Sequence, residues 1–366
     1  MSLLMSRARM NRTRIKGINE WRLGHTIRSF GFPPVYEAQG VIPMADEIMK
    51  SLYRIVVPLP NSPLKDLNSY VIKGEDRNLI IDTGFNRSVC YEAMKKGLDE
   101  LDIDLDRTDF MLTHMHSDHT GLVLRLASES SKIYFSRIDA RVFDKDISWQ
   151  PLIDFAELNG FPAGELQKAI ASHPGLKYSP HEIPVFTLVD DGDVIECGSY
   201  RLRCVATPGH TKGHICLYEE VKKIFFSGDH ILFDITPHIE SWAYDTNSLA
   251  DYIASLDKIY DLPVNLVLPG HRNFQGSLKK RIDELKIHHR ERADEVLKVL
   301  GSETLNAYAI AARMTWDIDC ETWEDFPIAQ RWFATGEAIA HLRYLEGEGR
   351  ITRDATEKIV TFCATS

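Results

Sequence analysis

Runs of apolar residues divide the chain into two series of strands, each accompanied by helical stretches. The first series is rich in β-branched and aromatic residues that end at turn residues, and it consists of 52–59, 67–74, 78–84 and 109–113. The second consists of 185–189, 200–207, 214–220, 223–229 and 264–270. Apolar positions three to five residues apart predict helices between these strands, around 89–101 and 249–259. Two strand sets with helices outside them predict a four-layer α/β/β/α sandwich.

Two further regions are mostly helical in pattern. Residues 138–184 carry aromatic side chains at helical spacing, interrupted at 160–162 and at Pro174. After His271, amphipathic helical segments precede a two-stranded ribbon at 351–362, an order typical of a winged-helix module. The predicted organisation is an N-terminal extension (1–48), a sandwich domain (49–272) with a helical insertion (138–184), and a small, mostly helical, winged-helix-like C-terminal domain (273–366).

The composition is that of an ordinary globular protein, with 44% hydrophobic and 26% charged residues. A net charge of -10 disfavours broad, non-specific nucleic-acid binding, which depends on neutralising phosphates. No run reaches the roughly 18 apolar residues of a membrane span, and the basic start of the chain has no apolar segment behind it. The six cysteines form no CxxC pair and lie in apolar surroundings, which favours a reduced, cytoplasmic protein over a disulfide framework.

The densest chemical signal is the sequence THMHSDH at 113–119. It places four candidate metal ligands directly after an apolar strand: His114, His116, Asp118 and His119. Side chains at this spacing on a turn can converge on a small volume, and imidazoles and carboxylates suit Zn²⁺ and related ions. Three more candidates follow apolar strands at Pro or Gly turns: His210, Asp229 and His271. A single histidine after a strand is more often a surface residue, but seven such groups together predict a metal site.

These motifs resemble those of the metallo-β-lactamase superfamily over residues 50–272, in particular its glyoxalase II-like branch and the branch of β-lactamase-like protein 2. The resemblance implies a catalytic domain with two divalent ions, zinc by default and iron or manganese as alternatives. It implies that one ion is held by His114, His116 and His210, and the other by Asp118, His119 and His271, with Asp229 bridging both.

The chemistry implied is hydrolysis by a hydroxide that bridges the two ions. Two divalent ions roughly 3.5–4 Å apart lower the pKa of a shared water toward 7. Asp118 would be catalytic, because it would both hold the second ion and orient the nucleophile. Asp229 stands where β-lactamases of this fold have Cys, and His116 stands where flavodiiron proteins have Glu. Antibiotic hydrolysis and a redox di-iron role are therefore disfavoured.

Other residues have supporting or ordinary roles in this interpretation. Asp82 in IIDTG matches a family position that hydrogen-bonds a ligand histidine, with turn capping as the alternative. His214 is expected to make structural hydrogen bonds rather than to bind metal. The remaining histidines considered are interpreted as ordinary surface or packed residues: His230, His238, His288, His289 and His341.

The insertion at 138–184 permits two interpretations. Its apolar side chains form either a lid or substrate wall at the mouth of the site, or a packed helical pair without a substrate role: Phe143, Trp149, Phe155, Leu158 and Phe161. The segment 236–242, just after Asp229, is another candidate wall. The sequence does not choose between these interpretations and names no substrate-binding residue.

The leading hypothesis is a hydrolase of a small-metabolite ester, thioester or lactone. Glutathione thioesters are disfavoured, because the basic residues with which glyoxalase II binds glutathione cannot be placed in this sequence. The alternative is a phosphodiesterase or endoribonuclease, favoured by the winged-helix resemblance and disfavoured by the acidic composition. A non-catalytic binding protein would be expected to lack ligands, and all seven are present. The expected partner is a small molecule, with nucleic acid not favoured and a homodimer compatible with the C-terminal helices.

Overall fold

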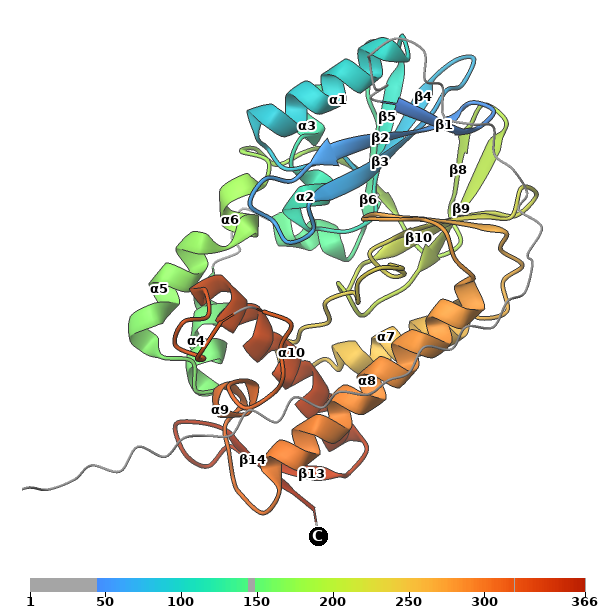
Figure 1. Cartoon of the computed structure of the whole chain (residues 1–366). Helices are drawn as coiled ribbons and strands as arrows, with labels where there is room; N and C mark the ends of the chain where they lie inside the picture. Colours follow the sequence, from blue (N-terminus) through green and yellow to red (C-terminus); the bar gives the residue numbers. More distant parts are fainter. Residues whose placement is uncertain (1–44, 144–148, 319, 366) are drawn as a thin grey trace, which may run out of the picture. The chain divides into compact units, whose positions relative to one another are not determined.

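The computed structural model describes residues 45–143, 149–318 and 320–365, all within one structural unit of the chain (Figure 1). Most of the predicted N-terminal extension, 1–48, lies outside the described residues. Its last four residues belong to strand β1 (Ala45–Met49), which pairs antiparallel with β2 (Leu52–Pro58). The first sheet therefore begins before the predicted boundary, because the polar residues of β1 hide its strand pattern.

The first sheet has seven strands in the order β1-β2-β3-β4-β5-β6-β7. The strands up to β4 pair antiparallel, and those from β4 to β7 pair in parallel. After β1 and β2 it contains β3 (Asp66–Ile72), β4 (Asn78–Ile81), β5 (Thr108–Leu112), β6 (Ile133–Ser136) and β7 (Phe186–Val189). The four residues of β6 are too short a run to give a periodic signal in the sequence.

The second sheet has five strands in the order β12-β11-β10-β9-β8. These are β8 (Val194–Cys197), β9 (Tyr200–Ala206), β10 (Ile215–Glu219), β11 (Ile224–Gly228) and β12 (Leu266–Pro269). The prediction that 185–189 opens this strand set is wrong, because β7 pairs in parallel with β6 of the first sheet. Two neighbouring parallel strands need a long crossover between them, and the insertion 138–184, which includes helices α4, α5 and α6, supplies it.

The two sheets face each other and carry helices on their outer sides. The core between them contains side chains of both sheets, such as Tyr70, Met111, Leu217 and Phe226. A second core lies between the first sheet and helices α1 (Ser88–Glu100) and α3 (Val123–Leu126), and a third between the second sheet and helices α7 (Ser248–Ile259) and α8 (Leu278–Leu300). The four-layer α/β/β/α prediction is confirmed (Figure 1).

The described residues of the insertion, 138–143 and 149–184, are largely helical, as expected, and the C-terminal region contains the expected helices and ribbon. The remaining elements are η1 (Leu105–Arg107), α2 (Ser117–Thr120), η2 (Asp139–Phe143), α4 (Gln150–Leu158), α5 (Ala163–Ser172), α6 (Pro174–Tyr178), α9 (Ala307–Ala311), α10 (Ile328–Gly347), β13 (Ile351–Asp354) and β14 (Thr361–Ala364). Phe155 packs in one core with Val296, Ile339 and Phe362, so the insertion is attached to the C-terminal region. Among the described residues, no helix has both the length and the apolar character needed to cross a membrane.

Helix α8 takes part in two cores. Its first half, with Ile282 and Leu285, covers the second sheet, and its second half, with Val296 and Leu300, packs in the C-terminal core. The boundary between 272 and 273 stays a prediction, since this helix follows it and belongs to both sides.

Candidate metal centre

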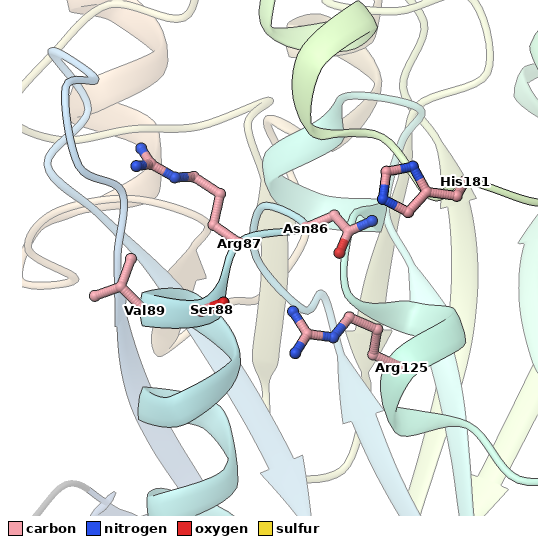
Figure 2. A pocket seen from close by; sticks show the side chains of 6 residues that line it. All are labelled: Asn86, Arg87, Ser88, Val89, Arg125 and His181. Carbon is pink, nitrogen blue, oxygen red and sulfur yellow. The ribbon is translucent and has the colours of Figure 1, made fainter.

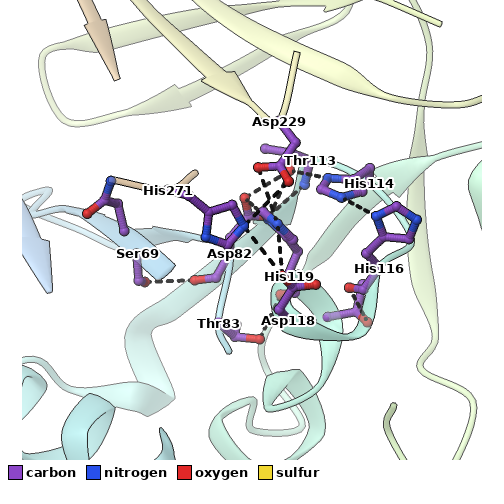
Figure 3. A network of polar contacts seen from close by, with 12 residues as sticks. Ser69, Asp82, Thr83, Thr113, His114, His116, Asp118, His119, Asp229 and His271 are labelled. Atoms are coloured by element: carbon purple, nitrogen blue, oxygen red, sulfur yellow. Dashed lines mark hydrogen bonds and ion pairs between the residues drawn. The ribbon is translucent and has the colours of Figure 1, made fainter. Parts of the chain in front are cut away.

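The predicted ligands come from segments that are far apart in sequence and lie at one edge of the sandwich. The residues of 113–119 follow β5 and continue into α2, so that His116 immediately precedes the helix. His210 lies in the connection from β9 to β10, and the other two follow β11 and β12. Figure 3 shows six of these side chains gathered in one place: His114, His116, Asp118, His119, Asp229 and His271. A rigid pair of sheets thus fixes the positions of loop side chains.

The structure brings the seven predicted ligands together in three overlapping groups. Within each group, the candidate ligand atoms all lie within 4.8 Å of one another. We call His114, His116 and His210 the imidazole group, and Asp118, His119 and His271 the carboxylate group; the third group is His114, His119 and Asp229. This is the division into two ligand sets that the sequence resemblance implies, although the ions themselves stay a prediction.

Asp229 lies between the imidazole group and the carboxylate group. Its Oδ1 is 3.6 Å from Nε2 of His119, and its Oδ2 is 3.7 Å from Nε2 of His210 and 3.4 Å from Nε2 of His271. Nε2 of His271 is also 3.4 Å from Oδ2 of Asp118. One carboxylate therefore faces donors of both groups, which is the position required of a bridging ligand.

Hydrogen bonds at the outer ring nitrogens fix the orientation of the ligand histidines. Nδ1 of His210 is 2.7 Å from the carbonyl oxygen of His238, and Nδ1 of His271 is 2.6 Å from the carbonyl oxygen of Asp66. A carbonyl oxygen only accepts, so each Nδ1 carries a proton and each Nε2 faces the centre. His116 is turned the other way, with Nδ1 lying 3.0 Å from Nε2 of His114.

Asp82 orients His119 of the carboxylate group through a hydrogen bond to its ring. Its carboxylate accepts hydrogen bonds from the backbone N–H and hydroxyl of Thr113, each at 2.8 Å, and from Nδ1 of His119 at 2.8 Å. Its φ of 61° is in the left-handed region, which Asp tolerates better than most residues. Asp82 thus contacts His119, a candidate ligand, which is the kind of contact that the sequence resemblance implies.

Asp139 is a buried residue at this site that the sequence reasoning missed. Its carboxylate accepts hydrogen bonds from the backbone N–H of Met115 at 3.0 Å, the hydroxyl of Thr211 at 2.7 Å and the backbone N–H of Gly213 at 2.7 Å. It therefore ties the 113–119 segment to the segment that carries His210. Burial raises the pKa of Asp139 to about 6, although these three bonds oppose the shift. Its position after a parallel strand was the available signal, but a lone Asp is too weak a motif.

The electrostatics of the centre favour a bound cation. Burial raises the pKa of Asp118, but His119 and His271 outweigh it and lower the pKa to about 2. Burial lowers the pKa of His271, but Asp229 and Asp118 outweigh it and raise the pKa to about 10. Buried carboxylates thus draw positive charge onto the imidazoles, and a divalent cation supplies positive charge directly.

Buried atoms without hydrogen-bond partners and the close approach of Gly270 also suit bound cations. Nε2 of His119, Nε2 of His271 and Oδ1 of Asp229 are buried without a hydrogen-bond partner among the described residues. Such atoms are costly unless something satisfies them. Gly270 lies against them, since a Cβ there would be 2.6 Å from Oδ1 of Asp229. The residues present therefore suit a pair of metal ions in the positions implied by the resemblance.

The other histidines divide into structural and unexpected cases. His214 is buried, with Nδ1 2.9 Å from the Thr207 hydroxyl, and its Nε2 accepts the backbone N–H of Asp229, which is a supporting hydrogen-bond arrangement. His238 differs from its interpretation as an ordinary residue. Its ring lies 3.3 Å from Glu240 and 3.5 Å from Glu337, and its carbonyl oxygen binds His210.

The family profile of the Metallo-beta-lactamase superfamily matches residues 65–271, more than half of the chain. The chain belongs to this superfamily. A second profile, Metallo-beta-lactamase-like, C-terminal domain, matches residues 324–365. The predicted resemblance is confirmed, and so is the prediction of a hydrolase of the superfamily.

Within the superfamily, the chain is similar to two named proteins and to one solved structure. The Beta-lactamase-like protein 2 homolog of Caenorhabditis elegans is 26% identical over 65% of this chain and 66% of its own length, just under two thirds. The Acyl-coenzyme A thioesterase MBLAC2 of Homo sapiens is 25% identical over 68% of this chain and 87% of its own. The crystal structure of a metallo-beta-lactamase family protein from Thermus thermophilus has a TM-score of 0.74 and 26% identity, covering 87% of this chain and all of that one.

Proposed function

We propose that this metallo-hydrolase is a binuclear acyl thioesterase that hydrolyses acyl-coenzyme A. The observation that carries the proposal is the arrangement of two donor groups around the single carboxylate of Asp229. The similarity to a human protein named as an acyl-coenzyme A thioesterase supports a thioester over the ester and lactone alternatives. Cytoplasmic location and zinc as the metal remain parts of this proposal.

The chain's own residues prepare the centre for hydrolysis. When bound, two divalent ions would polarise the thioester carbonyl and lower the pKa of water, so that the attacking group is available at neutral pH. Asp82 holds a proton on Nδ1 of His119 and thereby keeps Nε2 directed at the centre. The Asp118 carboxylate, with its pKa lowered to about 2, is ionised and able to accept a hydrogen bond from the attacking group. Residues of the chain thus supply orientation and negative charge.

A row of partly exposed rings extends from the imidazole group. We call Trp149, His173, His238 and Phe333 the aromatic row; its ring centroids are 5.0 Å apart for Trp149–His173, 5.4 Å for His173–Phe333 and 5.5 Å for His238–Phe333. It begins at the residue whose carbonyl oxygen binds His210. Trp149 and Phe333 of this row offer apolar contact to the acyl group of a thioester. The insertion thus combines both predicted roles, since Phe155 and Phe161 are packed while Trp149 belongs to this row.

The nucleic-acid alternative is not supported by the basic residues of α8. Lys279 pairs with Asp261, Lys286 with Asp257 and Arg292 with Glu337. Lys280 and Arg281 both pair with Glu284. Five basic side chains of this helix are thus paired with carboxylates, which reduces the charge available to attract phosphates.

A substrate panel tests the proposal. The metal-loaded chain is assayed with acyl-coenzyme A, a lactone, bis(p-nitrophenyl) phosphate and single-stranded RNA, beside the His116→Ala variant. We expect thioester hydrolysis to exceed the other activities and to be lost in the variant. Hydrolysis of RNA or the phosphodiester in preference to acyl-coenzyme A would contradict the proposal.

A further inference from the structure

An open pocket of about 620 Å³ lies at the start of α1. Figure 2 shows its lining, which comes from the start of α1, from α3 and from the segment after α6: Asn86, Arg87, Ser88, Val89, Arg125 and His181. Two guanidinium groups and an imidazole thus line a pocket that contains no carboxylate among its lining residues.

The two arginines are not neutralised by acidic neighbours. Arg87 donates to the carbonyl oxygen of Pro60 at 3.1 Å and lies over the ring of Tyr178, with Cζ 5.4 Å from the centroid. Arg125 lies over the ring of Tyr91, with Cζ 4.0 Å from the centroid. Within 45–143, 149–318 and 320–365, neither forms an ion pair with a carboxylate, whereas arginines such as Arg292 do. In a chain of net charge -10, this makes the pocket a local positive site.

The pocket is joined closely to the metal centre. Asn86 follows Asp82 by four residues, so their Cα atoms are at most about 14 Å apart. The backbone N–H of Thr83 donates to the carbonyl oxygen of His119 at 2.9 Å, and that of Asn86 donates to the carbonyl oxygen of Tyr178 at 3.0 Å. Arg125 is on α3, which closely follows α2 of the ligand motif. One elongated substrate could therefore occupy the pocket with one end and reach the metal centre with the other.

We propose that this pocket binds the phosphate groups of the coenzyme A moiety while the thioester lies at the metal centre. The inference rests on the proposed function and assigns the recognition of the leaving group to Arg87 and Arg125. Guanidinium groups match phosphate by paired, charge-assisted hydrogen bonds. In coenzyme A a long, flexible pantetheine arm separates the phosphates from the sulfur, so two separate sites for the two ends are chemically consistent.

Kinetics with and without the nucleotide test this assignment. One acyl group is presented as its coenzyme A thioester and as its N-acetylcysteamine thioester, which has no phosphate. In Arg87→Gln and Arg125→Gln we expect KM for the coenzyme A thioester to rise roughly tenfold each, with kcat and the N-acetylcysteamine reaction unchanged. Arg201→Gln is the matched control, since Arg201 is exposed and lies on β9. Equal effects on both substrates, or none on either, would overturn the assignment.

A binding measurement separates this inference from the proposed function. Adenosine 3′,5′-bisphosphate is titrated calorimetrically into the full chain and into the Arg87→Gln, Arg125→Gln double variant, at two salt concentrations. We expect binding that weakens with salt and is lost in the double variant. Unchanged binding in that variant excludes the pocket even if acyl-coenzyme A is hydrolysed. Binding that is lost, in a chain that hydrolyses no thioester, keeps the pocket and rejects the thioesterase.

Discussion

The imidazole group and the carboxylate group are adjacent but electrostatically different. Burial lowers the pKa of His116 to about 3, and His210 adds to the shift, so this ligand is neutral. In the carboxylate group, Asp118 is ionised and the neighbouring carboxylates raise the pKa of His271 to about 10 against the effect of burial. One half supplies lone pairs and the other supplies negative charge. Because the two halves differ in charge, they are expected to respond differently to substitution. Asp229 faces both halves, so a change there is expected to affect both.

Removing the shared carboxylate is expected to have the largest effect. Asp229→Ala deletes the group that faces both halves, and loss of metal stabilisation of several kcal/mol corresponds to about 10³-fold or more in turnover. Metal analysis by mass spectrometry should show fewer ions bound per chain, because the affinity for both ions falls. Circular dichroism should stay native-like, because the residue follows a strand. Full turnover in this variant would show that Asp229 is not part of the centre.

Breaking one half at a time is expected to separate the two groups. His116→Ala should release the ion of the imidazole group, and His271→Ala that of the carboxylate group, so that each variant retains about one ion. Because the carboxylate group carries the charge, the loss of affinity should be steeper at that half. The measurement is metal content after dialysis against a graded chelator. Identical loss of both ions in both variants would contradict the division.

Asp82→Asn tests the carboxylate group without removing a ligand. The amide can no longer provide the charge that favours protonated Nδ1 on His119, and we expect a roughly 10–100-fold loss of metal affinity or activity. Asp261→Asn is the control, since Asp261 is an exposed carboxylate paired only with Lys279 among the described residues. We expect only the carboxylate group to lose metal affinity. An equal loss of affinity in both groups would contradict the assignment of Asp82 to that group.

Glu337→Gln acts on the imidazole group through His238 and should have a smaller effect. His238 lies 3.5 Å from Glu337, and its carbonyl oxygen orients His210. Loss of the ion pair should lower the metal affinity of the imidazole group by up to about tenfold, which is the lower end of the effect of such supporting residues. Chelator titration measures this, with Glu348→Gln on the far end of α10 as the control. No change in either ion would show that His238 is held by other contacts.

The same cluster predicts a modest pH dependence of stability. Burial lowers the pKa of His238, but Glu240 and Glu337 raise it to about 10, and the corresponding pKa of Glu240 falls to about 2 although burial opposes this. The histidine contribution is complete below its unfolded pKa of 6.5 and is lost as the pH rises through about 10. The Glu337 contribution is complete above 4.5 and is lost at lower pH, because, against the effect of burial, His238 holds the pKa of Glu337 well below its ordinary value. The free-energy difference between wild type and Glu337→Gln should therefore be largest between pH 4.5 and 6.5, measured by urea unfolding.

Much of the fold and the clustering of the candidate metal ligands could be read from the sequence, because both leave strong local patterns. Apolar runs ending at Pro or Gly turns marked strands such as β11 and β12 together with the ligands that follow them. The sheet to which β7 belongs could not be read, since pairing is decided by contacts between distant residues. Asp139 and His238 were missed for the same reason. Each is a single residue whose role depends on partners brought near by the fold.

Helix α8 completes two cores with opposite ends of one continuous segment. A recombination event that joined the sandwich of this protein to the C-terminal region of a relative would have to cut that helix or import it whole. Either outcome creates a mismatched surface against one of the cores. The two regions are therefore expected to be inherited together, and exchange of the C-terminal region by gene fusion should demand compensating changes along α8.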